Sequence, residues 1–334
     1  MYIFLTGGKT MGHITPLLSI YKRLYKEYEI VYFGLSNSME EKECERLGIT
    51  FFKLKCLPFY RKNLFKNFKT IYYIIKDIKT IKEKYKNCSI KAIFSSGGFV
   101  SIPLTLSFRN NKKIKKILIE PNIVIGLANK FLLRYVNYIC VAFPTFKGKK
   151  FRLTGNPIEI EVSKFDHPSF YVKKEMILFL GGSNGALEIV KLAYDFNQKN
   201  PSIPIFVITG ERYYDTYVFN ENAYVFKKIS SISSIFEKFK IIVSRSGAST
   251  ITEIIKTNSC AIFLPSKNVS ANHQYKNAKY LVDRGCAIMI DDYTETSYQE
   301  VTTVYQNDVL ITKIKNTISE LNFKNSVEEV IKLM

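Results

Sequence analysis

Residues 6–13 read TGGKTMGH and lie between a short apolar run, Tyr2 to Thr6, and a longer amphipathic one. Glycines let the main chain turn tightly and approach a ligand closely, and a helix that follows offers amide N–H groups and a positive dipole end to an anion. The spacing matches neither the GxGxxG motif of dinucleotide sites nor a P-loop. The stretch therefore predicts strand, turn and helix, and fits both a simple βα turn and an anion-binding loop.

A second stretch of the same kind, LGGSNGA at residues 180–186, follows another apolar run. Its Ser183 and the helix start beyond it suit a diphosphate. Two such loops at matching positions are harder to explain as simple turns than one. His13, one of three histidines, closes the first loop, where it suits a helix-start hydrogen bonder and a general base equally well.

Short apolar runs alternate with amphipathic ones along the whole chain. This order is typical of βαβ units, which build a parallel sheet covered by helices. The strands predicted in the first half are Tyr2 to Thr6, Glu29 to Phe33, Thr50 to Leu54, Ala92 to Phe94, Ile117 to Ile119 and Tyr138 to Ala142. Those predicted in the second half are Met176 to Leu180, Ile203 to Ile208, Ile241 to Ser244, Ala261 to Leu264 and Ala287 to Ile290.

The chain of 334 residues is longer than one hydrophobic core usually supports, so two domains are expected. The turn TGNP at residues 154–157, followed by the aperiodic polar stretch 159–174, marks the boundary. We predict an α/β protein of two doubly wound, Rossmann-like domains, residues 1–157 and 158–334, facing each other across a cleft. Ligands in such sheets bind beyond the carboxyl ends of the strands. The final stretch, 307–334, has a helical pattern.

Charge is concentrated in one part of the chain. Residues 51–150 carry 22 basic and 3 acidic side chains, whereas residues 1–50 carry 6 of each and residues 151–334 carry 21 and 20. Such a region predicts a partner with dense negative charge, either nucleic acid or an anionic membrane. The stretch 61–86 combines apolar residues at intervals of three and four with a lysine-rich flank, which fits a packed helix or a membrane-surface helix. The charge excess favours the membrane, and the absence of a recognised binding module argues against nucleic acid.

The six cysteines show no CxxC or metal-ligand spacing, so we expect them to be reduced and buried. No window approaches the roughly 18 apolar residues of a spanning helix, and the N-terminal apolar run is too short for a signal peptide. We therefore expect a cytosolic, soluble or peripheral protein.

Two further stretches could carry chemistry. VSRSGASTITE at residues 243–253 puts small residues at a helix start, where amides can bind phosphate, and Glu253 could accept from a ribose diol; a capped helix explains the pattern as well. ANHQYKNA at residues 271–278 could bind sugar hydroxyls or cap its helix. With no Asp-x-Asp, His-x-x-x-His or clustered carboxylates, we expect no metal and no cofactor, and helix N-termini would stabilise a diphosphate leaving group.

The ordered set of motifs over nearly the entire chain resembles the MurG family. The matching stretches are GGKTMGH (7–13), SSGGFV (95–100), IGLANK (125–130), GNP (155–157), GGSNGA (181–186), SRSGAST (244–250) with Glu253, and HQYKNA (273–278). The resemblance implies the GT-B fold and a peripheral enzyme on the cytoplasmic face of the plasma membrane. It further implies inverting transfer of N-acetylglucosamine from UDP-GlcNAc to lipid I, which forms lipid II of peptidoglycan.

The resemblance also implies roles for individual residues. His13 would act as the base near the acceptor hydroxyl, and Gly97 and Gly98 would lie on the acceptor side. The residues implied to contact the UDP-sugar are Thr10, Met11 and Gly12 near the sugar and diphosphate, Asn122 on the N-acetylglucosamine, Ser183 on a phosphate, Ile229 at the uracil edge, Ala248, Ser249, Thr250, Ile251, Thr252 and Glu253 around the diphosphate and ribose, and Gln274 on the sugar hydroxyls.

The chain departs from the family pattern at two positions. Ile119 stands where family members commonly have histidine, and Glu159 stands where they have arginine. Three alternatives remain open. Glu159 is compatible with a UDP-hexose transferase acting on another lipid such as a diacylglycerol, Ile119 is compatible with a catalytically silent membrane-docking subunit, and a UDP-N-acetylglucosamine 2-epimerase would share the two-domain architecture. An epimerase needs several cleft carboxylates, which the sequence does not show, and the retained donor-side residues argue against a silent subunit.

Overall fold

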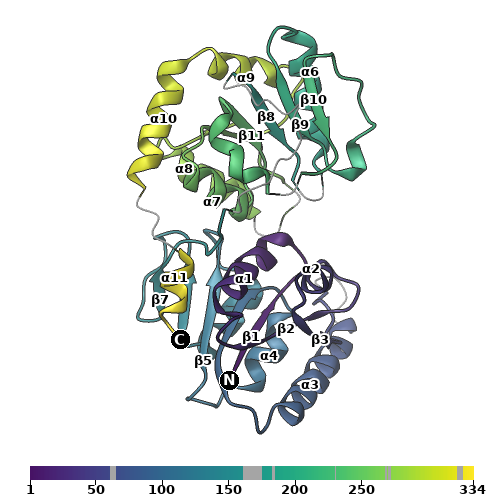
Figure 1. Cartoon of the computed structure of the whole chain (residues 1–334), viewed down its shortest axis with the longest axis vertical. Coiled ribbons are helices and arrows are strands. Elements are labelled where there is room, and N and C mark those ends of the chain that lie inside the picture. Colours follow the sequence, from purple (N-terminus) through teal and green to yellow (C-terminus); the bar gives the residue numbers. More distant parts are fainter. Residues whose placement is uncertain are drawn as a thin grey trace. The chain divides into compact units, whose positions relative to one another are not determined.

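The computed structural model describes residues 1–60, 65–160, 175–182, 185–229, 231–267, 269, 272–321 and 326–334. The chain forms two compact units (Figure 1), the first made of Met1–Glu159 and Lys324–Met334 and the second of Ile160–Phe323. The first unit thus ends two residues after the predicted boundary. Most of the predicted linker, residues 161–174, lies outside the described residues.

The first unit is built on a parallel sheet of seven strands in the order β3-β2-β1-β4-β5-β6-β7. Its strands are β1 (Tyr2–Gly7), β2 (Glu29–Leu35), β3 (Thr50–Leu54), β4 (Ile90–Gly97), β5 (Lys115–Glu120), β6 (Tyr138–Val141) and β7 (Phe151–Leu153). Its helices are α1 (Met11–Leu24), α2 (Met39–Leu47), α3 (Lys66–Lys84), α4 (Ser101–Ser107), α5 (Leu127–Leu132), the 3-10 turn η1 (Leu133–Tyr135) and α11 (Ser326–Ile331).

Alternation along the central strand builds a core on each face of this sheet. Phe4 packs into one cluster, whereas Ile3 and Leu5 on the same strand pack into the other, because successive strand side chains point to opposite faces. Each predicted strand of this half coincides with an observed one. Strand β7, a three-residue edge strand without a fully buried side chain, was not predicted.

The second unit repeats the design with six parallel strands in the order β10-β9-β8-β11-β12-β13. The strands are β8 (Ile177–Leu180), β9 (Ile205–Ile208), β10 (Ala223–Phe226), β11 (Ile241–Ser244), β12 (Ala261–Phe263) and β13 (Ile288–Met289). The helices are α6 (Leu187–Lys199), α7 (Ala248–Lys256), α8 (His273–Val282), α9 (Ser297–Tyr305) and α10 (Asp308–Glu320), with 3-10 turns η2 (Glu211–Tyr213) and η3 (Ile232–Lys238). Strand β10 was not predicted, because it is an edge strand whose residues are all partly exposed.

The C-terminal segment differs from the predicted domain assignment, because α11 packs on the first unit. Val327 and Val330 are fully buried in the cluster that also contains Ile14 of α1. The Ser326 hydroxyl donates to the carbonyl oxygen of Asn156 at 2.8 Å. A helical period shows that a segment is amphipathic but does not tell which sheet its apolar face covers.

Helix α3 lies on the same face of the first sheet as α4, since both contribute to one core cluster. Its buried positions are Thr70, Ile74, Asp77 and Ile81. At its N-terminal end Phe65 is 84% exposed and Phe68 is 71% exposed, and further along the helix Ile75 is 61% exposed. Residues 61–64, which the predicted amphipathic stretch included, lie outside the described residues. None of the described helices is both long and apolar enough to cross a membrane.

Candidate active site

The first glycine-rich loop joins β1 to α1 at the carboxyl end of the central strand. Gly8 passes directly over the buried Glu40 of α2, since a Cβ atom at Gly8 would lie 2.4 Å from a Glu40 carboxylate oxygen. That carboxylate also accepts from the backbone N–H of Lys9 at 3.4 Å and of Leu35 at 3.3 Å. Helix α1 begins at Met11, and its first turn contains no acidic residue. No carboxylate within that turn therefore neutralises the positive end of the helix dipole.

His13 is fixed by the end of the neighbouring strand. Thr6 pairs with Ser95 and Gly7 pairs with Gly97, so Ser96 is an extra residue in β4. Its carbonyl oxygen lies 2.7 Å from Nδ1 of His13, and its hydroxyl donates to the His13 carbonyl oxygen. Because a carbonyl can only accept, Nδ1 carries the proton, and the neutral imidazole therefore keeps its lone pair on Nε2.

The predicted acceptor-side glycines lie beside this histidine. Gly97 has φ 105° and Gly98 has φ 78°, a region that favours glycine. A Cβ atom at Gly97 would lie 3.2 Å from Cε1 of His13 and 2.9 Å from the Asn129 amide oxygen. The strand end thus brings the tip of β4 into close contact with α1 and α5.

Asn122 lies in the loop after β5. Its backbone and side-chain amides both donate to Oε1 of the buried Glu120, at 3.1 and 3.2 Å. The first unit therefore gathers seven predicted site residues at the carboxyl ends of β1, β4 and β5, namely Thr10, Met11, Gly12, His13, Gly97, Gly98 and Asn122.

In the second unit the corresponding loop follows β8. Gly181 donates its N–H to the carbonyl oxygen of Ile208 at 2.8 Å, and α6 begins at Leu187. Ser183 lies outside the described residues. Ile229, predicted at the uracil edge, is half-buried in the loop after β10.

Helix α7 begins immediately after β11 with Gly247 as its N-cap. No side chain caps this helix, and its first turn has no acidic residue. The first backbone N–H groups of the helix therefore have no hydrogen bond to a capping side chain. The Ser249 hydroxyl oxygen is buried and has no hydrogen-bond partner among the described residues. The side chains of Ile251 and Thr252 are buried, and the Thr252 hydroxyl donates to the Ala248 carbonyl oxygen at 2.8 Å. The backbone N–H of Ile251 donates to the Gly247 carbonyl oxygen at 2.9 Å, so it too is used within the helix.

Glu253, one turn further along α7, is an unusual carboxyl group. Burial raises its pKa to about 7, and a hydrogen bond from Ser233 partly opposes this rise. A carboxyl group with a pKa near neutrality is typical of functional sites, although structural networks also produce such values.

Gln274 lies at the start of α8 with a defined amide orientation. Its Oε1 accepts from the backbone N–H of Ser266 at 2.9 Å, and its carbonyl oxygen accepts from the Ser246 hydroxyl at 2.8 Å. The amide NH₂ group is therefore the part of the side chain that can meet a sugar hydroxyl.

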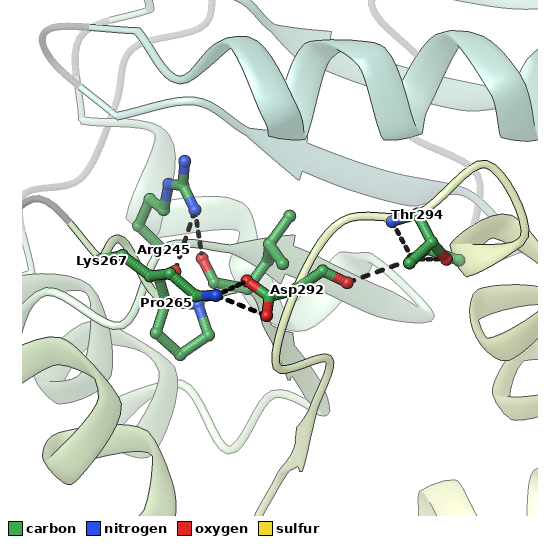
Figure 2. A network of polar contacts seen from close by, with 7 residues as sticks. Arg245, Pro265, Lys267, Asp292 and Thr294 are labelled. Atoms are coloured by element: carbon green, nitrogen blue, oxygen red, sulfur yellow. Dashed lines mark hydrogen bonds and ion pairs between the residues drawn. The ribbon is translucent and has the colours of Figure 1, made fainter.

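Arg245 joins the loops of the second unit (Figure 2). Its guanidinium donates to the carbonyl oxygens of Leu264 and Pro265, at 2.8 and 3.2 Å. It also donates to the Glu188 carboxylate of α6 at 2.5 Å. Beside it, Lys267 pairs with Asp292 at 2.5 Å. Arg245 thus connects the ends of β11 and β12 with the helix that follows the second glycine-rich loop.

No role was predicted for Ser96, Glu120, Asn129 or Arg245, although each lies inside a quoted motif or directly beside one. For Ser96, Glu120 and Arg245 the signal was a polar residue at the end of an apolar strand, whereas Asn129 lies in α5 and gave no such signal. Among the described residues, no group of three His, Cys, Asp or Glu side chains could hold a metal ion.

The structure accounts for the charge at Glu159. Its carboxylate lies 2.5 Å from Nε of Arg23 on α1, and its backbone N–H donates to the Ser19 hydroxyl at 3.2 Å. The negative charge of Glu159, which departs from the family pattern, is therefore paired with a positive charge within the first unit.

Comparison with known proteins agrees with this architecture. The N-terminal domain model of glycosyltransferase family 28 matches residues 3–141, and the C-terminal domain model matches residues 176–333. A Lactobacillus acidophilus protein described as UDP-N-acetylglucosamine–N-acetylmuramyl-(pentapeptide) pyrophosphoryl-undecaprenol N-acetylglucosamine transferase is 30% identical over 100% of this chain and 99% of its own. A Bacillus pumilus protein of the same description is 32% identical over 87% and 85%.

Among solved structures, MurG from Acinetobacter baumannii superposes with a TM-score of 0.79 at 23% identity, covering 99% of this chain and 98% of that one. Two parallel Rossmann-like sheets with both family 28 domains define a glycosyltransferase of the GT-B fold. Within that class, the chain belongs to the MurG family.

Proposed function

We propose that this enzyme transfers N-acetylglucosamine from UDP-GlcNAc to lipid I, the undecaprenyl-linked N-acetylmuramyl pentapeptide, and so forms lipid II. The relatives that align over the whole chain bear the name of this activity. The observation that carries the proposal is the arrangement of His13, whose Nδ1 lies 2.7 Å from the Ser96 carbonyl oxygen, so that Nε2 is the basic nitrogen of the neutral ring.

His13 would act as the general base. Nε2 takes the proton of the acceptor hydroxyl while that oxygen attacks the anomeric carbon of the donor sugar from the face opposite UDP. The C–O bond to the β-phosphate breaks, the configuration inverts, and the electron pair leaves with UDP. The Ser96 carbonyl stabilises the imidazolium by keeping its hydrogen bond to Nδ1.

The donor would be held by the second unit. The amides at the start of α7 and the positive end of its dipole suit the diphosphate, whose charge grows as the bond to the sugar breaks. Glu253 would accept from the ribose hydroxyls, and the NH₂ group of Gln274 would donate to a sugar hydroxyl. In this mechanism helix dipoles stabilise the leaving group without a metal ion.

The first unit would dock on an anionic membrane surface, at the cytoplasmic face of the plasma membrane. The exposed Phe68 and Ile75 lie on the same helix as Lys66, Lys69 and Lys76, and the exposed Phe65 is the N-cap of that helix. Apolar side chains that insert into the lipid headgroup region, with lysines beside them, are the pattern of peripheral membrane helices. A lipid-linked acceptor requires such a position.

The test is a metal-free calorimetric titration with UDP-GlcNAc, UDP-glucose and UDP-galactose, followed by an assay with lipid I. Selective binding of UDP-GlcNAc and formation of lipid II support the proposal. Preference for a UDP-hexose would indicate another glycolipid product, and the absence of donor binding would indicate a silent subunit. Either result would overturn it.

A further inference from the structure

One buried carboxylate organises the loop that carries Asn122. Glu120 ends β5 and is 1% exposed. Its Oε1 accepts from the backbone N–H and the side-chain NH₂ of Asn122, at 3.1 and 3.2 Å. Its Oε2 accepts from the backbone N–H of Gly126 at 2.9 Å and from the Asn129 NH₂ at 2.8 Å. Four donors thus compensate one buried charge.

This arrangement determines how two amides are oriented. An ionised carboxylate can only accept, so each asparagine must turn its NH₂ group toward Glu120 and its oxygen away. The Asn129 amide lies against Gly97, on the side where His13 also packs. The Asn129 Oδ1 is buried and has no hydrogen-bond partner among the described residues. A buried amide oxygen without a hydrogen-bond donor lowers the stability of the fold, so we expect this orientation of the amide to have a functional role.

We propose that Glu120 is a positioning residue that turns the Asn122 amide oxygen toward the substrate side of the Gly97 loop and fixes the Asn129 amide against Gly97. The wall of the site then presents the Asn122 oxygen as a hydrogen-bond acceptor. It selects a substrate group that donates, such as a sugar hydroxyl or the N–H of an N-acetyl group, over one that can only accept. This inference rests on the proposed function, because it takes the carboxyl ends of β4 and β5 as part of the sugar-binding site.

The test exchanges the hydrogen-bond donor and acceptor between Glu120 and Asn129, which contact each other. Glu120→Gln puts an NH₂ group where a carboxylate oxygen stood, and Asn129→Asp puts a second carboxylate beside Glu120. Each single variant breaks the pairing, and each should lower the Tm. In the double variant the NH₂ group introduced by Glu120→Gln can donate to the carboxylate introduced by Asn129→Asp, so the pair is restored with donor and acceptor exchanged. We expect the double variant to recover part of the lost Tm, because the Gly126 N–H, which donates to the same Glu120 oxygen at 2.9 Å, still faces the introduced NH₂ group.

Two controls separate orientation from general packing. Glu120→Asp keeps an acceptor-only group and should be milder than Glu120→Gln. Asp77→Asn removes another buried carboxylate of the same unit, which accepts from the Lys55 N–H at 3.1 and 3.0 Å. It should lower the Tm, leave the KM for UDP-GlcNAc unchanged, and show no recovery when combined with Asn129→Asp.

The kinetic expectation is a rise in KM for a sugar substrate of about 2- to 10-fold in Glu120→Gln, the effect of losing one hydrogen bond to a neutral amide oxygen. Additive Tm losses in the double variant would overturn the proposal, as would unchanged KM values in Glu120→Gln. The Tm experiment needs no substrate. It therefore tests the amide orientation even if the wild-type protein forms no lipid II, a result that would contradict the proposed function alone.

Discussion

Glu253→Gln should stabilise the protein at neutral and alkaline pH. Burial raises the pKa of Glu253 from its ordinary value of 4.5 to about 7. Between these values the folded state keeps a proton that the unfolded state has lost, so the stability contributed by the neutral group is lost as the pH rises through this window. Glutamine is neutral at every pH, and its Oε1 can still accept from Ser233.

The gain in stability expected for Glu253→Gln can be calculated from the two pKa values of Glu253. A rise from 4.5 to about 7, at about 1.4 kcal/mol per pH unit, corresponds to about 3 kcal/mol above pH 7. For a unit of this size that is a Tm increase of about 6 to 12 °C. Below pH 4.5 both proteins carry a neutral group and should unfold at nearly the same temperature.

Thermal unfolding followed by circular dichroism from about pH 4 to about pH 9 measures this difference. Glu221→Gln removes an exposed carboxylate of the same unit and serves as the control, with an unchanged Tm expected throughout. A Glu253→Gln difference that stays constant with pH, or that is largest in acid, would refute the reasoning. Loss of UDP-GlcNAc binding in the stabilised variant would separately support the ribose-binding role.

Three further predictions concern the proposed mechanism. His13→Ala should lower turnover by at least about a hundredfold while UDP-GlcNAc affinity stays nearly intact, since the base acts only on the acceptor; unchanged turnover would rule out the role. Replacing Phe65 and Phe68 by serine should weaken binding to anionic vesicles about tenfold or more. Val309 is an exposed apolar residue of the second unit, and Val309→Ser should leave this binding unchanged. Equal effects of the two changes would contradict a docking helix. Arg245→Lys should raise the KM for UDP-GlcNAc about tenfold, because the single ammonium group of lysine cannot replace a planar guanidinium that binds two carbonyls and a carboxylate. An unchanged KM would show that these contacts do not position the donor-binding loops.

The sequence was sufficient for features that depend on neighbouring residues. Apolar runs, glycine turns and amphipathic periods identified eleven of the thirteen strands in the described part of the chain and the start of each half, because these patterns extend over one element at a time. It was also sufficient for the family, because the spacing of several weak motifs along a chain is specific in combination. The missed strands, β7 and β10, are short edge strands, which bury too little to produce a clear pattern.

Only the tertiary structure decided which distant residues meet. The parallel order of β1 and β4 brings Ser96 to His13 across 83 positions, and a single extra residue in β4 aims its carbonyl at the imidazole. The return of α11 to the first unit and the pairing of Glu159 with Arg23 were likewise invisible in the sequence. A residue's type and local period show that it will be buried or charged, whereas its partner is set by strand order and packing, which are properties of the whole fold.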